Sequence, residues 1–257
     1  MINCQQINCK PRDLTQPPNS FANPYLRSMQ HVVFEDYRAV DLRPLTFTRP
    51  VWDLRCGILT LREKWQHALE LDAPALGRAV GHLAAKFNTH TPQGDDTRYI
   101  NGKLLPGDAL VFALLNLPPE TALMAPNGDV LAFRTTDAKA IRENAYVLED
   151  TLMADLLTET FTGDYDAIDY PWHLFKHAKA QIAWDYTKLT AGRRSQPIED
   201  AGSLIYGADN VFVEEGARIK AAIIDAENGP IYIGKGATIQ PGAIIQNSHA
   251  ICDHATV

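Results

Sequence analysis

The stretch IYIGKGATIQPGAIIQNSHAICDHATV, residues 231–257, decides the fold of the C-terminal part of the chain. Aliphatic residues recur in it at every sixth position, at Ile233, Ile239, Ile245, Ile251 and Val257. This period matches neither the helical turn of about 3.6 residues nor the two-residue alternation of a strand. It is typical of a parallel β-helix, whose coils have three short sides, each with an aliphatic residue pointing inward. We therefore predict the start of a parallel β-helix over residues 201–257.

The repeat continues to the last residue, Val257, and no polar capping segment follows it. Repeat folds normally close with a polar terminal unit, because an open end exposes the apolar core. We therefore expect the chain to be truncated at its C-terminus and to be part of a longer protein.

The composition narrows the class of protein. The chain has 24 basic and 31 acidic residues and a net charge of −7, which argues against a general nucleic-acid binder. Its longest apolar run, Ala109–Leu115, is far shorter than the ~20 residues of a membrane span. The four cysteines contain no C-x-x-C pair, so reduced thiols are the simplest interpretation. We expect a cytoplasmic protein with no nucleic-acid and no membrane partner.

The remaining chain divides into two parts by its composition and periodicity. Residues 1–29 are polar, rich in proline and without periodicity, which predicts a disordered leader. Residues 30–200 mix strand and helix patterns, which predicts an α/β domain.

Local signals place several elements within residues 30–200. A strand is expected at His31–Asp36, and Thr60 with Glu63 forms a capping-box pattern before a helix. Asn127-Gly128 predicts a hairpin turn between two strands, because these residues tolerate positive φ. Further expected elements are a strand within 98–105, a short helix opened by 106–108, and helices over 136–160 and 171–190.

The stretch VDLRPLTFTRPVWDLRCGILTLREKW, residues 40–65, resembles the opening motif of a known family. This family comprises sugar nucleotidyltransferases related to bifunctional N-acetylglucosamine-1-phosphate uridyltransferase/glucosamine-1-phosphate acetyltransferase. Further similar stretches occur in order along the chain, at residues 100–106, 170–175, 192–197 and 227–234. The resemblance implies a nucleotidyltransferase-like α/β domain followed by the start of a left-handed parallel β-helix.

The resemblance also implies an activity. Such enzymes transfer a nucleotidyl group from a nucleoside triphosphate to a sugar 1-phosphate, with Mg²⁺ as cofactor, and release pyrophosphate. The β-helix implies a homotrimer and, in the full-length protein, an acyltransferase that uses acetyl-CoA. Two alternatives stay open: a non-catalytic sugar-nucleotide-binding or assembly protein, and a protein that is chiefly an acyltransferase acting through the complete β-helix.

One departure from the family pattern bears on catalysis. Pro44-Leu-Thr46 and Pro50 match the family's P-L-T-x-x-x-P segment, but Val51 stands where the family has lysine. The preceding segment, residues 35–41, lacks the family's glycine-rich G-x-G-T-R loop. Glycines give such a loop the freedom to turn its amides toward phosphates. Either arginines replace this cradle, or nucleotidyl transfer is weak or lost.

The candidate site residues follow from charge and position. Arg43, Arg49 and Arg55 recur at six-residue spacing after the first strand, and we predict them as the catalytic, phosphate-binding cations. Surface ion pairs are the alternative for these arginines. The predicted substrate-binding residues are Thr46, Lys64, Asn101 and Lys103.

Other polar and aromatic residues carry weaker predictions. Asp164, Asp166 and Asp169 fit a solvated acidic loop better than a metal site, so the metal ligands stay unknown. Trp172 and Phe175 are expected to pack in the core or between domains, with base stacking as the alternative. The histidines of the β-helix, His249 and His254, are expected at the surface.

Overall fold

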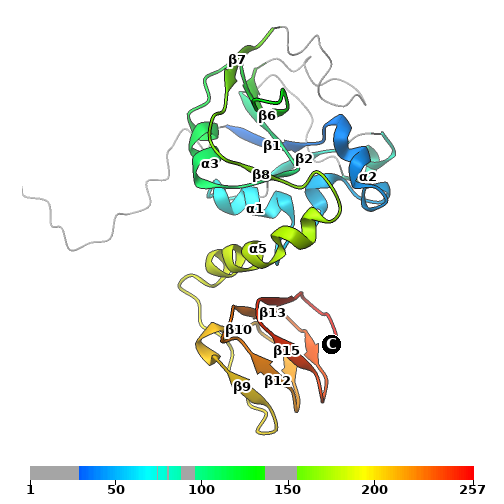
Figure 1. Cartoon of the computed structure of the whole chain (residues 1–257), viewed down its shortest axis with the longest axis vertical. Coiled ribbons are helices and arrows are strands. Elements are labelled where there is room, and N and C mark those ends of the chain that lie inside the picture. The colour runs from blue at the N-terminus through cyan, green and yellow to red at the C-terminus, as the bar shows by residue number, and fades with distance from the viewer. Residues whose placement is uncertain (1–28, 74, 80, 88–95, 137–154) are drawn as a thin grey trace, which may run out of the picture.

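The structure is a computed structural model that describes residues 29–73, 75–79, 81–87, 96–136 and 155–257. The predicted leader, residues 1–29, therefore lies outside the described residues except for Met29. Figure 1 shows an α/β part, a C-terminal unit of short strands, and the long helix α5 (His173–Thr190) between them.

The α/β part contains a six-stranded mixed sheet in the order β2-β1-β3-β6-β5-β7. The strands are β1 (Gln30–Phe34), β2 (Leu76–Arg78), β3 (Thr97–Asn101), β5 (Thr121–Met124), β6 (Val130–Thr135) and β7 (Leu157–Thr160). A separate antiparallel pair joins β4 (Leu104–Leu105) to β8 (Asp166–Ala167). Among the described residues of this part, the α-helices are α1 (Leu61–Ala68), α2 (Ala84–Phe87) and α3 (Asp108–Leu115).

The strand directions bring several loops to one edge of the sheet. Strand β1 lies parallel to both β2 and β3, and β3 lies antiparallel to β6. The end of β1 at Phe34 is in register with the end of β3 at Asn101. Because β6 runs in the opposite direction, its first residues lie at this same edge. Ligands of open α/β sheets commonly bind where parallel strands end.

The sheet has apolar side chains on both faces. One face, with Val33 and Ile100, packs against Trp65 of α1 and Leu110 of α3 in the largest buried cluster. The other face carries a second cluster that includes Phe34, Tyr99 and Phe133. Tyr99 and Phe133 stack with ring centroids 4.7 Å apart.

Most of the predicted elements are confirmed. Helix α1 begins after the capping box, in which Thr60 Oγ1 accepts from the Glu63 amide and the Glu63 carboxylate accepts from the Thr60 amide. The hairpin of β5 and β6 turns through Gly128 at φ 87°. Helix α3 starts at Asp108 as the sequence predicts.

The helix predicted over 136–160 is wrong at its C-terminal end. Leu157–Thr160 forms strand β7, parallel to β5, with Thr121 opposite Leu157. Pairing along β5 and the two β-branched threonines favour a strand over the helix. The rest of the predicted helix, residues 137–154, lies outside the described residues.

A buried ion pair ties helix α5 to the domain. Lys64 of α1 binds the carboxylate of Asp185 on α5, and both side chains are fully buried. The amides of Ile58 and Leu59 donate to Asp185 Oδ2 at 2.7 and 3.1 Å. Burial lowers the pKa of Lys64 and raises the pKa of Asp185, and their mutual attraction opposes both shifts.

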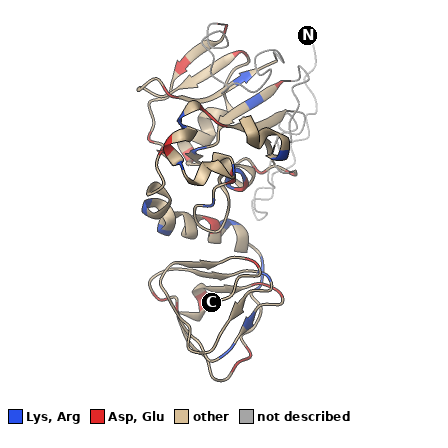
Figure 2. Cartoon of the chain, turned by 90° about the vertical axis from the view of Figure 1, so that its right-hand side faces the viewer, with Lys and Arg blue, Asp and Glu red and all other residues tan. Residues whose placement is uncertain are grey.

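The C-terminal unit consists of short parallel strands in three small sheets. Their orders are β10-β13-β16, β11-β14 and β15-β12-β9. The strands are β9 (Leu204–Tyr206), β10 (Val211–Val213), β11 (Arg218–Ile219), β12 (Ile223–Asp225), β13 (Ile231–Ile233), β14 (Thr238–Ile239), β15 (Ile244–Gln246) and β16 (His249–Ile251). Figure 2 shows the triangular outline of this unit.

The six-residue pattern supplies the core of this unit. Ile233, Ile239, Ile245 and Ile251 are at most 5% exposed and belong to one apolar cluster. Val257, in the last coil, is 50% exposed. Phe212 and Tyr232 of the unit pack with Ile58 of the α/β part and Tyr186 of α5. The unit therefore rests on helix α5 and on the turn that Asp185 holds.

The buried ion pair generates a stability prediction. Asp185→Ala leaves the ammonium of Lys64 buried without its partner, and should lower the free energy of unfolding by about 3–5 kcal/mol. Lys179→Ala, at an exposed position of the same helix, should change it by less than about 0.5 kcal/mol. Urea unfolding of both variants measures the difference. Equal small losses would contradict a structural role for the pair.

Candidate functional site

The loop after β1, residues 35–54, is held by its own side chains. Glu35 Oε1 accepts from the Val51 amide at 2.8 Å, and Thr46 Oγ1 donates to the Ala39 carbonyl at 2.7 Å. Asp36 caps a 3-10 helix at residues 37–42 by accepting from the Arg38 amide at 3.0 Å. This carboxylate therefore occupies an amide at the start of the loop.

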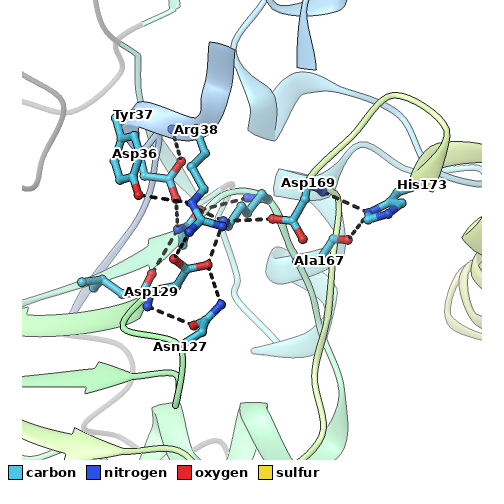
Figure 3. Close-up of polar contacts among 11 residues, drawn as sticks. Asp36, Tyr37, Arg38, Asn127, Asp129, Ala167, Asp169 and His173 are labelled. Carbon is cyan, nitrogen blue, oxygen red and sulfur yellow. Dashed lines mark hydrogen bonds and ion pairs between the residues drawn. The ribbon is translucent and has the colours of Figure 1, made fainter. Parts of the chain in front are cut away.

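Lys103 is the centre of a polar cluster at the carboxyl edge of the sheet. Its Nζ lies 3.3 Å from Asp36, 3.5 Å from Asp129 and 3.0 Å from Asp169. These aspartates follow β1, precede β6 and follow β8, respectively. Figure 3 shows their side chains turned toward a common centre. The topology therefore gathers three carboxylates, distant in sequence, around one ammonium.

Asn101 and Arg38 complete the cluster. Asn101 Nδ2 donates to Asp36 at 2.8 Å and to the Val130 carbonyl at 3.0 Å. The Arg38 guanidinium lies 2.9 Å from Asp129. Burial alone would lower the pKa of Lys103, but the carboxylates of Asp36, Asp169 and Asp129 raise it above its usual value. The ammonium is therefore kept charged.

The cluster is buried on one side and open to solvent on the other. The Lys103 and Asp36 side chains are 4% and 6% exposed, whereas Arg38 and Asp169 are 34% and 33% exposed. Three carboxylates face two cations, so the five side chains carry a formal charge of −1. Because the cluster carries a net negative charge, an anionic ligand at this rim needs cations in addition to Lys103 and Arg38.

Mg²⁺, the predicted cofactor, would need oxygen ligands from the protein. Within the described ranges, no group of three or more His, Cys, Asp or Glu side chains is arranged to hold a metal ion. Mg²⁺ typically takes one or two carboxylates and completes its coordination with substrate phosphates and water. The partly exposed carboxylates of Asp169 and Asp129 fit that smaller role.

The three predicted arginines have separate surroundings. All three are exposed. Arg43 lies over the Phe47 ring at 5.3 Å, Arg49 lies 4.0 Å from Asp53, and Arg55 donates to the Ile58 carbonyl. The Arg49 contact is one of the surface ion pairs that the sequence left as the alternative. Their role toward phosphate stays a prediction.

The four predicted substrate-binding residues fall into two groups. Asn101 and Lys103 lie together in the cluster at the sheet edge. Thr46 is buried and donates to the Ala39 carbonyl, and Lys64 is fully buried against Asp185. These contacts give Thr46 and Lys64 a structural function in the loop and in the attachment of α5.

Asp36, Arg38 and Asp129 of the cluster are not among the site residues predicted from the sequence, and Asp169 was expected in a solvated loop. Asp36 and Arg38 had a usable signal, since they directly follow the first strand. Asp129 directly follows the predicted turn at Asn127-Gly128, and a turn pattern carries no signal for a site. The position of Asp169 depends on the pairing of β8 with β4, which no local sequence pattern predicts.

The packing predicted for two aromatic residues is wrong. Trp172 is 60% exposed and Phe175 is 83% exposed, so neither lies in the core or between domains. The aliphatic residues Ile182 and Leu189 form the inward side of α5 instead. The two histidines of the C-terminal unit, His249 and His254, are exposed, as the sequence predicts.

Comparison with known families identifies the class of protein. A family model described as sugar nucleotidyl transferase matches residues 31–194, which include helix α5 and all of the six-stranded sheet except Gln30, the first residue of β1. The chain therefore belongs to the sugar nucleotidyl transferase family, as the resemblance of residues 40–65 implies. A search of curated proteins finds no match. Within the described residues, no helix combines the length and apolarity needed to cross a membrane.

The Lys103 cluster generates a second stability prediction. Lys103→Met leaves three carboxylates without their shared ammonium, and should lower the free energy of unfolding at neutral pH by about 3–5 kcal/mol. Lys103→Arg retains the positive charge and should lose less. Lys235→Met, at an exposed ion pair with Glu215, serves as the control, with a change below about 0.5 kcal/mol. Thermal and urea unfolding test this ranking, and a Lys103→Met loss no larger than the control's would contradict it.

Proposed function

We propose that the protein transfers a nucleotidyl group from a nucleoside triphosphate to a sugar 1-phosphate, giving an NDP-sugar and pyrophosphate. The observation that carries this proposal is the polar cluster around Lys103, at the carboxyl edge of a sheet that lies within the family match. The relation to bifunctional uridyltransferase/acetyltransferase enzymes is part of the same proposal.

The reaction needs two anions held close together. An oxygen of the sugar phosphate attacks the α-phosphorus, and the bond from that phosphorus to the bridging oxygen of the β-phosphate breaks. The departing pyrophosphate takes the electron pair, so cations that meet the developing charge lower the barrier. Arg38 belongs to the cluster, the exposed Arg43 and Arg49 follow on the same loop, and the exposed Arg55 comes directly after it. We assign phosphate binding to these four arginines.

Mg²⁺ is the proposed cofactor. It supplies charge neutralisation for the phosphates when bound. Asp169 and Asp129 are its proposed protein ligands, because their carboxylates are the most exposed of the three in the cluster. Asp36 is engaged by Asn101, Lys103 and the Arg38 amide, and it serves to position Lys103.

A non-catalytic sugar-nucleotide-binding protein is the second candidate. The observation that favours it is the loop after β1, where Asp36 accepts from the Arg38 amide and no glycine precedes the 3-10 helix. A loop so capped offers fewer amides to a triphosphate than a glycine-rich one. Such a protein would bind the nucleotide but would not transfer its nucleotidyl group.

The C-terminal unit is proposed to be the start of a left-handed β-helix that assembles as a homotrimer. Its sheet β15-β12-β9 presents Leu204, Ile223 and Ile244 in one register row. Leu204 and Ile244 are 54% and 63% exposed. Exposed aliphatic rows of this kind mark contact surfaces. Acetyl-CoA-dependent acyl transfer by a complete β-helix stays a further candidate activity.

The transferase proposal is tested by pyrophosphate release from a panel of nucleoside triphosphates and sugar 1-phosphates with Mg²⁺. At least one pair of substrates should turn over. Arg38→Ala and Arg49→Ala should each lower kcat/KM about ten- to a hundredfold, since a charge-assisted bond contributes ~1.5–3 kcal/mol. Arg218→Ala, exposed in the C-terminal unit, should leave it unchanged. Nucleotide binding without release across the panel would favour the second candidate.

The trimer is tested by sedimentation at several protein concentrations. The unchanged chain should sediment as three copies, and Ile244→Asp should give a single copy, because it places a charge in the apolar row. Gln246→Asp, exposed on the same strand, is the matched control and should remain trimeric. If the unchanged chain sediments as one copy at all concentrations, the proposed trimer is ruled out.

A further inference from the structure

Two exposed aromatic residues, Tyr170 and Trp172, closely follow Asp169 of the Lys103 cluster in the chain. The rings of Tyr170 and Trp172 stack with centroids 4.6 Å apart and planes 6° from parallel. Tyr170 is 42% exposed and Trp172 is 60% exposed. Large aromatic side chains normally bury most of their surface. A stacked pair that is exposed to solvent therefore indicates a contact surface.

The stacked rings of Tyr170 and Trp172 pack against His173. The His173 ring meets both rings edge-on, with centroids 5.5 Å from Tyr170 and 6.1 Å from Trp172. His173 Nδ1 lies 3.1 Å from the Ala167 carbonyl and 3.2 Å from the Asp169 amide, so its ring is anchored to the segment after β8. Trp172 also directly precedes helix α5, which begins at His173. These contacts orient the two rings before any ligand arrives.

The chain connection keeps the stacked rings of Tyr170 and Trp172 close to the Lys103 cluster. Asp169, which immediately precedes Tyr170, has its carboxylate 3.0 Å from Lys103 Nζ. Three residues of chain span at most about 11 Å when fully extended, so Trp172 is tethered within that distance of Asp169. The reach of a ribose and base from their phosphates is comparable. Figure 3 shows Asp169 between the cluster and His173, which supports the stacked rings.

We infer that the Tyr170–Trp172 pair is the platform on which the nucleobase of the substrate stacks. This inference rests on the proposed function, since it supplies the base subsite for the same nucleotide whose phosphates meet Arg38. Tyr170 covers one face of the indole ring, and the 60% exposure of Trp172 leaves surface on which a further ring can extend the stack.

A nucleobase fits this surface better than a sugar ring. A base is flat on both sides and continues a parallel stack, whereas a pyranose turns hydroxyl groups toward at least part of any flat surface. Stacking of a base on an aromatic side chain contributes ~1–3 kcal/mol and tolerates different bases. The platform therefore recognises a nucleotide as a class and leaves the choice of base to other contacts.

Tryptophan fluorescence provides the binding measurement. Trp52 and Trp65 are at most 1% exposed and Trp184 is partly buried, whereas Trp172 is 60% exposed, which makes Trp172 the tryptophan most accessible to quenching by a ligand in solution. The full chain is titrated with uridine and adenosine triphosphates and, as a probe without a base, with inorganic tripolyphosphate, all with Mg²⁺. The nucleotides should quench emission, and tripolyphosphate should not.

The matched variants separate stacking from phosphate binding. By calorimetry, Trp172→Ala should raise the Kd of the nucleotides about five- to a hundredfold and leave the Kd of tripolyphosphate unchanged. Phe175→Ala removes an aromatic ring that is 83% exposed three residues further on, and should leave both values unchanged. Trp172→Tyr should restore part of the nucleotide affinity.

The outcomes distinguish this inference from the proposed activity. An unchanged nucleotide Kd in Trp172→Ala, with pyrophosphate release intact, overturns the platform and leaves the transferase standing. Base-dependent quenching without pyrophosphate release from any substrate pair supports the platform and overturns the transferase. A loss of sugar 1-phosphate affinity alone, or a changed sedimentation coefficient in Trp172→Ala, overturns the platform because it assigns the rings to another partner.

Discussion

The contact of the Lys103 ammonium with Asp36, Asp129 and Asp169 is the interaction on which the candidate site depends. Each aspartate comes from a different part of the sheet edge, so the lysine fixes the relative positions of three loops. Isolated buried carboxylates would be costly, and the shared ammonium offsets that cost. In the proposed function, the remaining negative charge at the exposed rim allows Mg²⁺ to join the protein to an anionic substrate.

A second buried lysine has a different function in the same fold. Lys64 pairs with Asp185 alone, and both are closed off from solvent. That pair fixes helix α5 against the turn at residues 57–59, and the C-terminal unit packs on the same helix. The start of α5 carries the stacked rings of Tyr170 and Trp172. The attachment of this helix therefore determines where the rings stand relative to the cluster.

The sequence predicts those parts of the structure that depend on local chemistry. The capping box at Thr60 and Glu63, the turn at Gly128 and the buried isoleucines of the six-residue repeat all agree with the structure. Strand β7 was missed because its pairing with β5 decides its conformation. The site was predicted only in part for the same reason. Asn101 and Lys103 lie near each other in sequence, whereas Asp129 and Asp169 reach them through strand pairing.

The position of the nucleotide tests the central claim most directly, and a crystal structure with a nucleoside triphosphate and Mg²⁺ soaked in would provide it. Our account predicts phosphate oxygens within hydrogen-bonding distance of Arg38, a metal on Asp169 or Asp129, and no phosphate contact to the buried Lys64. A nucleotide bound away from the carboxyl edge of the sheet, with the Lys103 cluster untouched, would contradict it.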